Sequence, residues 1–389
     1  MPMRIVHMGF YQDPEDRAPA ELLRAWPTLV DVAESVTRAG ARVTVVQACS
    51  RSQLIHQNGV AYHFMPGAGV GRVGRGAFAA LMRTTTPHLL HVHGLGFARE
   101  VSSLAEIAPG IPILLQDHAS RPPHWWCRRA WRRCSDLVSG VAFCSRQQAR
   151  AFIDTGALGR DLPVYEIPES TSRFTPGGGA AARNASTAEG NPLLLWVGHL
   201  DVNKDPITVL DGVAEAARTL PDLRLWCCFG KAPLLPRVRR RIAADPLLAE
   251  RVRLLGHVLH TQVEQLMRAA DFFVSGSHRE GSGYALIEAL ACGLPPIVTD
   301  IPSFRALTGT GAVGRLWRPG DAHALCSALL ESVARAGVDT RAAVSAHFER
   351  ELSIDALGRK LAAVYAELVT RAERAGRPGP QPRTTAMRA

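Results

Sequence analysis

The feature that most constrains the fold is an alternation of short apolar runs with helix-forming stretches, which occurs twice along the chain. In the first half, strands are expected at residues 3–9, 42–47, 89–93, 113–116, 141–144 and 165–168. In the second half, they are expected at residues 193–197, 223–229, 252–255, 271–274 and 297–299. Strands that alternate with helices form mostly parallel sheets covered by helices. The sequence therefore predicts two doubly wound α/β domains in tandem.

A stretch rich in Gly, Ala, Ser and Asn separates the two alternating regions, from Thr175 to Asn191. This composition is typical of a linker, and 389 residues are too many for one ordinary core. We therefore divide the chain into an N-terminal domain (1–175), a linker (176–191) and a C-terminal domain (192–345).

The end of the chain is predicted to be helical from Val338 to Arg374, with one apolar face. The residues of this face are Leu357, Leu361, Val364, Tyr365 and Leu368. Their three- and four-residue spacing indicates a helix that buries this side. We assign residues 346–373 to the helix and the Pro- and Arg-rich residues 374–389 to a disordered tail.

Composition bounds the partners and the location of the protein. A net charge of +10 favours anionic partners such as nucleotides. Nucleic acid is not expected, because the basic run Arg237–Arg241 has no aromatic residues among its arginines. The eight cysteines lack metal or disulfide spacing, and no signal peptide or membrane-spanning run is predicted. We expect a cytoplasmic protein with no metal site.

A glycine-containing loop leads into a helix between Ser277 and Asp300. Backbone N–H groups at a helix N-terminus bind anions, helped by the helix dipole, so a phosphorylated ligand is predicted here. Glu280 lies in the loop and Glu288 in the helix eight residues later, where both could accept hydrogen bonds from hydroxyl groups. Phosphate and polyol recognition together indicate a sugar nucleotide.

Several N-terminal strands end on a glycine or lead into polar residues, and open α/β sheets bind ligands at such carboxyl ends. These residues are Gly9, His93, Asp117 and His118. We take them as candidates for the acceptor side of a site, with His93 the strongest. A core histidine that bonds a loop is an equally good interpretation of His93.

Four motifs in the expected order resemble glycosyltransferase family 4, whose members are retaining transferases with the GT-B architecture. The motifs are the Glu280–Glu288 spacing within EGSGYALIEALACGLPPI, WVGHLDVNKD at 196–205, the stretch from Leu254 to Ser277, and IPESTSRFTP at 167–176. The resemblance extends from about Arg4 to Leu368. It implies two Rossmann-like domains facing each other across a cleft, with a C-terminal helix that crosses back to the N-terminal domain.

The resemblance also implies an activity, the transfer of a hexose from a nucleoside-diphosphate sugar to an acceptor, with retention of configuration and without a metal or other cofactor. Catalytic roles would fall to Glu280, Lys204 and His93. The donor would contact Gly198, His199, Lys204, Glu280, Gly281, Ser282, Gly283, Tyr284, Ala285 and Glu288. In this set, Lys204 and the amides of residues 281–284 would face the diphosphate, Glu288 the ribose and Glu280 the sugar.

Three residues depart from the family pattern. His199 stands where an arginine is usual, Ser282 where an aromatic residue is usual, and Glu169 where an asparagine is usual. The departures indicate a subfamily with its own specificity. They also keep open a different class of function, a catalytically silent nucleotide-sugar binder or assembly partner. A sugar-nucleotide epimerase shares the two-domain architecture but lacks the Glu280–Glu288 spacing.

The acceptor is left open among glycans, lipid-linked sugars and small molecules. Residues 124–134, HWWCRRAWRRC, carry three tryptophans and four arginines. Such a segment suits a peripheral contact with the inner face of a membrane, and hence a lipid-linked acceptor. The alternative is a helix whose tryptophans pack inward, which we favour because the Trp and Arg positions do not separate onto two faces.

Overall fold

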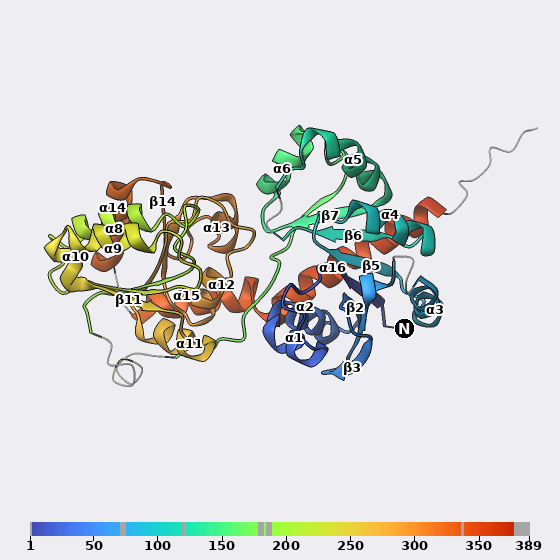
Figure 1. Ribbon diagram of the computed structural model, residues 1–389, viewed down its shortest axis with the longest axis horizontal. Helices are drawn as coiled ribbons and strands as arrows, with labels where there is room; N and C mark the ends of the chain where they lie inside the picture. Colours follow the sequence, from blue (N-terminus) through green and yellow to red (C-terminus); the bar gives the residue numbers. More distant parts are fainter. Residues whose placement is uncertain are drawn as a thin grey trace, which may run out of the picture.

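The computed structural model describes residues 2–70, 75–118, 121–177, 183, 189–335 and 338–376. Two α/β domains lie side by side, and the last helix runs from the C-terminal domain along the N-terminal one (Figure 1). Each domain is built on one sheet, and most neighbouring strands are parallel. The predicted fold class is therefore confirmed.

The N-terminal sheet has eight strands in the order β3-β4-β2-β1-β5-β6-β7-β8. They are β1 (Arg4–Gly9), β2 (Arg42–Ala48), β3 (Gln53–Gln57), β4 (Val60–Met65), β5 (Leu89–His93), β6 (Ile113–Gln116), β7 (Gly140–Phe143) and β8 (Val164–Glu166). All neighbours are parallel except β3 and β4, which form an antiparallel hairpin. This hairpin was not predicted from the sequence, because β4 alternates buried and half-exposed residues and so has no continuous apolar run.

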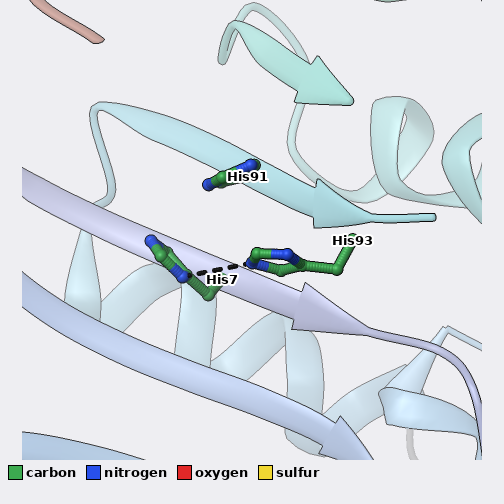
Figure 2. Close-up of side chains that lie close together, drawn as sticks. All are labelled: His7, His91 and His93. Atoms are coloured by element: carbon green, nitrogen blue, oxygen red, sulfur yellow. Dashed lines mark hydrogen bonds between the residues drawn. The ribbon is translucent and has the colours of Figure 1, made fainter. Parts of the chain in front are cut away.

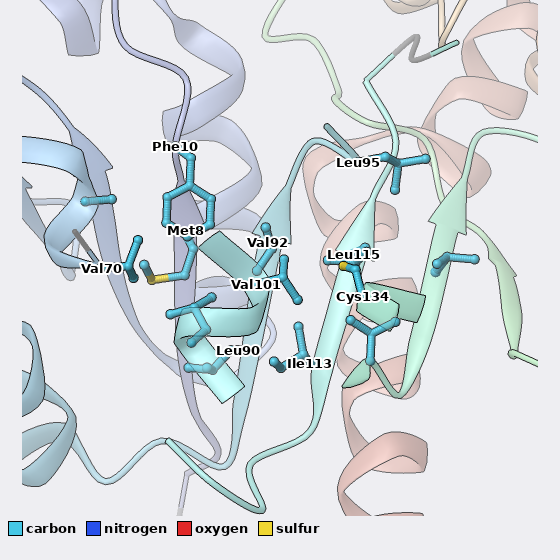
Figure 3. Packing of buried hydrophobic residues seen from close by; sticks show 14 of the residues in the cluster. Met8, Phe10, Val70, Leu90, Val92, Leu95, Val101, Ile113, Leu115 and Cys134 are labelled. Carbon is cyan, nitrogen blue, oxygen red and sulfur yellow. The ribbon is translucent and has the colours of Figure 1, made fainter. Parts of the chain in front are cut away.

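Helices cover both faces of this sheet. They are α1 (Pro19–Ala25), α2 (Pro27–Arg38), α3 (Arg75–Thr85), α4 (Ala98–Ile107), α5 (Arg128–Leu137) and α6 (Arg146–Asp154), with short 3-10 turns η1 (Pro66–Gly69) and η2 (Trp125–Cys127). On one face, Met8 of β1, Phe10 directly after this strand and Val92 of β5 pack with Val101 of α4 (Figure 3). Burial on both faces explains why the central strands read as continuous apolar runs.

The C-terminal sheet has six parallel strands in the order β11-β10-β9-β12-β13-β14. They are β9 (Leu193–Val197), β10 (Arg224–Cys228), β11 (Val252–Gly256), β12 (Phe272–Ser275), β13 (Pro296–Thr299) and β14 (Arg315–Trp317). Its helices are α8 (Pro206–Ala216), α9 (Leu235–Ala243), α10 (Pro246–Arg251), α11 (His260–Ala269), α12 (Tyr284–Ala291), α13 (Pro302–Leu307), α14 (Ala322–Ala334) and α15 (Val338–Glu351). The chain order reverses at β9, and ligands of open α/β sheets bind at such a point.

The last helix, α16 (Ile354–Gly376), returns to the N-terminal domain and packs along α2. Its predicted apolar face is buried in the N-terminal core together with residues of α1 and α2. Gly358 permits the close approach, since a Cβ there would lie 2.1 Å from the carbonyl oxygen of Ser35. The predicted helical region is thus two helices, α15 and α16, separated by residues 352–353, and α16 extends to Gly376.

The predicted domain boundaries stay a prediction. Most of the linker at 176–191 and residues 377–389 of the tail lie outside the described residues. Among the described residues, no helix combines the length and the apolar composition that crossing a bilayer would require.

Candidate functional site

Gly283 shapes the start of helix α12. It caps the helix with a φ of +84°, a conformation that glycine adopts without strain. A Cβ at this position would lie 2.6 Å from Cε1 of Phe304, so no side chain fits. The helix therefore begins at Tyr284, directly after the glycine loop that the sequence singled out.

Two of the predicted catalytic residues form an ion pair. Nζ of Lys204 bonds Oε1 of Glu280, and both side chains are mostly buried. Lys204 comes from the loop between β9 and α8, and Glu280 from the loop before α12. Because burial weakens screening by salt and water, this pair holds the ammonium group near the head of α12.

Hydrogen bonds join the two loops that carry this pair. Oδ1 of Asp201 accepts from the amides of Asn203 at 2.9 Å and Lys204 at 3.0 Å. Nδ2 of Asn203 donates to the carbonyl oxygen of Arg279 at 2.9 Å. The amide of His278 donates to the carbonyl oxygen of Asn203 at 2.8 Å. These four hydrogen bonds therefore hold the backbone of Lys204 in place without a bound ligand.

The N-terminal domain contacts the glycine loop through Gln148 of α6, which the sequence analysis missed. Its Nε2 donates to the carbonyl oxygens of Glu280 at 2.8 Å and Gly281 at 3.0 Å. Its Oε1 accepts from the amide of Ser145 at 2.8 Å, which completes a capping box at the start of α6. The Ser145–Gln148 spacing was a visible signal for the cap, but not for the contact between domains.

Two of the residues that depart from the family pattern contact each other. Oε1 of Glu169 accepts from the amide of Ser282 at 2.6 Å, and the amide of Glu169 donates to Oγ of Ser282 at 2.9 Å. Both residues are buried. In this arrangement the Ser282 amide is occupied, so it is not available to a diphosphate.

Glu288 lines a cavity of about 490 Å³ between the two domains. The cavity is also lined by Trp26, Thr28 and Asp31 of the N-terminal domain, by residues 170–174, and by His260, Glu264 and Tyr284. Oε1 of Glu288 bonds Nε2 of His260 at 2.6 Å, and this bond raises the pKa of His260. Glu288 thus lies where a ligand between the domains could reach it.

His199 offers a hydrogen-bond donor beside Lys204. It is exposed, and its Nδ1 accepts from the amide of Lys231 at 3.2 Å. In a neutral ring the proton then lies on Nε2, which can donate to an anion. A Cβ on Gly198, the residue before His199, would lie 3.7 Å from Cδ of Lys204. Gly198 and Lys204, both predicted to contact the sugar nucleotide, therefore lie close together.

A second cavity, of about 650 Å³, lies at the carboxyl ends of β1, β2 and β5. Three of the four predicted acceptor-side residues line it, namely Gly9, His93 and His118. A Cβ on Gly9 would lie 2.0 Å from Oε1 of Gln47, so a larger residue here would have to displace the Gln47 side chain. Asp117, the fourth, is buried and is not among the lining residues, and its amide donates to the carbonyl oxygen of Ala142 at 2.9 Å.

Three histidines cluster on neighbouring strands beside this cavity, His7 on β1 and His91 and His93 on β5 (Figure 2). Nδ1 of His7 and Nε2 of His93 lie 3.3 Å apart. Burial lowers the pKa of His7 to about 3 and lowers the pKa of His91 and of His93 well below the usual value. All three rings are therefore neutral near pH 7.

One ring nitrogen from each of these histidines lies within 4.8 Å of the others, which is the spacing of a loose metal site. The rings already bond their neighbours, however. Tyr365 Oη bonds Nδ1 of His91 at 2.7 Å and Nε2 of His7 at 3.1 Å. Nδ1 of His93 bonds Nε2 of His118 at 3.2 Å. We assign no metal to the cluster, and the bonding of His93 favours its interpretation as a core histidine.

Comparison with known proteins bears on both domains. Residues 191–335 match the family described as "Glycosyl transferases group 1". The chain is 28% identical over 231 residues to the GDP-mannose:cellobiosyl-diphosphopolyprenol alpha-mannosyltransferase of Xanthomonas oryzae pv. oryzae, a match that covers 58% of this chain and 59% of that protein. It is 30% identical over 253 residues to the D-inositol 3-phosphate glycosyltransferase of Geodermatophilus obscurus, covering 61% and 55%. The chain thus spans less than two thirds of the length of these relatives.

The solved structure of Anabaena HepE in complex with UDP matches with a TM-score of 0.69 at 18% identity, over 94% of this chain and all of that one. At this identity the likeness concerns the fold, which is two Rossmann-like domains with a C-terminal helix that crosses back. The chain has the GT-B fold, and its residues 191–335 match the glycosyl transferases group 1, in agreement with the predicted resemblance.

Proposed function

We propose that this chain transfers a hexose from a nucleoside-diphosphate sugar to a hydroxyl group of an acceptor, with retention of configuration and without a metal ion. The observation that carries the proposal is the Lys204–Glu280 pair at the head of α12, where Gln148 of the other domain contacts the same loop. One relative is named for GDP-mannose and a structural neighbour holds UDP. Both support a nucleoside-diphosphate sugar without choosing the base.

Departure of the nucleoside diphosphate builds up negative charge that fixed donors can stabilise. Lys204 would supply a cation, His199 a ring N–H, and α12 its first amides and its dipole. The ammonium group of Lys204 would pair with the diphosphate in place of Glu280. The carboxylate of Glu280 would then accept a hydrogen bond from a sugar hydroxyl. Glu288 would likewise release its hydrogen bond with His260 and accept hydrogen bonds from the ribose hydroxyls. The leaving phosphate takes the acceptor proton, so no protein base is required.

The acceptor would bind in the N-terminal cavity. Tyr11 is 60% exposed there, and its ring centroid lies 5.8 Å from that of Trp26, which makes an aromatic surface suited to a sugar ring. Among the described residues that line the cavity, Arg17 is the one lysine or arginine, and Asp13 and Glu15 both pair with it. An uncharged or amine-bearing polyol therefore fits better than a phosphate ester.

Isothermal calorimetry with UDP, GDP and ADP tests the donor site first. Incubation of the preferred nucleotide's sugars with neutral and aminated sugar acceptors should then release free nucleoside diphosphate. Release should persist in excess EDTA, and the product's anomeric signal in NMR should match that of the donor. Binding of none of the three nucleotides would overturn the proposal, and a β-product from an α-donor would overturn retention.

A catalytically silent nucleotide-sugar binder is the second candidate. The occupied Ser282 amide favours it, because the bond to Glu169 takes up one of the amides that would otherwise face the diphosphate. Binding of a nucleotide sugar without release of diphosphate, over a broad acceptor panel, would support this candidate against the transferase.

A peripheral membrane contact from the cytoplasmic side is proposed for residues 124–134. Trp125 and Trp126 are 73% and 62% exposed, whereas Trp131 packs on Phe152 with ring centroids 5.9 Å apart. The inward-packing interpretation thus holds for one tryptophan of three. Co-sedimentation with phosphatidylglycerol vesicles at low salt should fall when Trp125 and Trp126 are both changed to Ala. Equal sedimentation of the two proteins would exclude the contact.

A further inference from the structure

The carboxylate of Glu169 has two different partners, one in each half of the molecule. Its Oε1 accepts from the amide of Ser282 in the glycine loop at 2.6 Å. Its Oε2 lies 3.0 Å from Nδ1 of His118, at the wall of the N-terminal cavity. The side chain of Glu169 is only 6% exposed, so both contacts are made away from water. One buried group therefore connects the candidate donor loop to the candidate acceptor cavity.

From His118 an unbroken series of hydrogen bonds continues into the core, and we call it the histidine chain. Its members, in order, are Glu169, His118, His93, His7, Tyr365 and His91. The successive bonds are His118 Nε2 to His93 Nδ1 at 3.2 Å, His93 Nε2 to His7 Nδ1 at 3.3 Å, His7 Nε2 to Tyr365 Oη at 3.1 Å, and Tyr365 Oη to His91 Nδ1 at 2.7 Å. Figure 2 shows the bond between His7 and His93.

The carboxylate of Glu169 sets the direction in which hydrogen bonds are donated along the histidine chain. A carboxylate only accepts, so Nδ1 of His118 must carry a proton and donate to Glu169. When His118 carries this single proton, its Nε2 accepts, and His93 in turn donates from its own Nδ1. The same reasoning gives His7 protonated at Nδ1, Tyr365 donating to Nε2 of His7, and His91 donating from Nδ1 to Tyr365.

At the far end of the chain, Nε2 of His91 is fully buried and has no partner at hydrogen-bond distance. Burial lowers the pKa of His91, and an interaction with the side chain of Gln116 opposes this shift. The direction of the chain therefore rests on Glu169.

We propose that Glu169 is a positioning residue: its carboxylate holds the glycine loop through the Ser282 amide and at the same time places the proton of His118, His93 and His7 on Nδ1. The rings at the wall of the acceptor cavity then have one fixed hydrogen-bonding arrangement, and that arrangement depends on the residue that contacts the donor loop. Ser282 and Glu169 are two departures from the family pattern, and they act as one unit.

Glu169→Gln tests the direction without removing the side chain. The glutamine carbonyl can still accept from the Ser282 amide, but its NH₂ group now faces Nδ1 of His118 and can only donate. The protons of His118, His93 and His7 should therefore move from Nδ1 to Nε2. Nitrogen NMR of protein labelled at histidine distinguishes the two tautomers, with each signal assigned by a His→Gln variant.

The matched control is Glu166→Gln, three residues earlier on the same segment, where the carboxylate accepts from the amide of Arg146 at 2.9 Å and contacts no histidine. It should leave all tautomers as in the wild type. Wild-type His93 protonated at Nε2, or Glu169→Gln with unchanged tautomers, would overturn the proposal. This measurement needs no ligand and no activity, so it stands even if the proposed transferase function fails.

A second arm rests on the proposed function and measures nucleotide affinity. Glu169→Ala removes the bond to the Ser282 amide, and loss of a charged hydrogen bond should weaken binding of UDP or GDP at least tenfold by calorimetry. Glu169→Gln keeps that bond and should stay within about threefold of the wild type. Equal affinities of the alanine variant and the wild type would contradict the role in the loop. Absence of binding by the wild type would instead contradict the proposed function.

Discussion

At the scale of single residues, the Lys204–Glu280 pair carries most of the proposed chemistry. In the structure the two charges neutralise each other, and a bound diphosphate would separate them. Lys204→Ala should lower turnover by about 100-fold, because one fixed donor to the leaving group is typically worth about 3 kcal/mol. Glu280→Gln should lower turnover as well. It should lower the melting temperature less than Lys204→Ala does, because the glutamine side chain still bonds Lys204. Diphosphate release, measured together with the melting temperature, checks both variants.

Lys360→Ala is the matched control for this prediction. This variant removes another lysine–glutamate pair, in which Nζ of Lys360 lies 3.0 Å from Oε2 of Glu351. Lys360 is on α16, and neither residue lines the two cavities described above. Its turnover should equal that of the wild type. A similar loss of turnover in Lys360→Ala and Lys204→Ala would show that the effect is structural.

The motifs that hold the candidate site residues could be identified from the sequence, but the hydrogen-bond partners of these residues could not. Lys204, Glu280 and Glu288 stand in motifs, and the structure places all three at the head of α12 or in the cavity between domains. Glu169 and Ser282 were visible only as separate departures, because they lie 113 residues apart and no local pattern links them. Gln148 is 132 residues from Glu280, and its sequence context indicates only a helix cap.

At the scale of elements, the contact between α16 and α2 depends on Gly358. A methyl group there would meet the backbone of Ser35 at 2.1 Å, and backbone cannot move aside as a flexible side chain can. Gly358→Ala should therefore lower the free energy of unfolding by about 2 kcal/mol, despite the better helix propensity of alanine. Gly376→Ala, at the open end of the same helix, should be neutral or slightly stabilising. Urea unfolding of the two variants measures the difference, and equal stabilities would refute the packing argument.

The elements themselves were predicted where periodicity was strong. The buried parallel strands have apolar runs, and the face of α16 has helical spacing, so both could be identified. The return of that face to the N-terminal domain followed only from the family resemblance, and its partner α2 was not predicted, because a periodic pattern shows that a face is buried but not by what. The β3–β4 hairpin was missed because its strands lie at the edge of the sheet and keep many residues half-exposed.

At the scale of the whole molecule, the buried histidines make stability depend on pH. Burial depresses the pKa of His7, His91 and His93 in the folded protein, whereas in the unfolded chain they have a pKa near 6.5. Below that value the unfolded state binds more protons, so stability should fall as the pH falls. Between pH 6 and 4.5 the slope should exceed about 1.4 kcal/mol per pH unit, the limit for one proton.

Urea unfolding at several pH values measures this slope. His260 and His323 have a raised pKa, so they are protonated in both states over this range and add little to the slope. His7→Gln should reduce the slope, whereas His323→Gln at the surface should leave it unchanged. A flat profile from pH 6 to 4.5 would show that the histidine chain accepts protons without unfolding.

The return of α16 to the N-terminal domain has a consequence for how the chain is made. The last strand of the first sheet ends at Glu166, but the helix that covers α2 begins at Ile354. At about 5 to 20 residues per second, the ribosome needs roughly 10 to 40 s to synthesise the residues between them. During that interval the apolar surface of α1 and α2 has no cover, and the nascent chain is open to chaperones and to aggregation. The N-terminal domain is therefore the first to be synthesised, but its core can be completed only after α16 has left the ribosome.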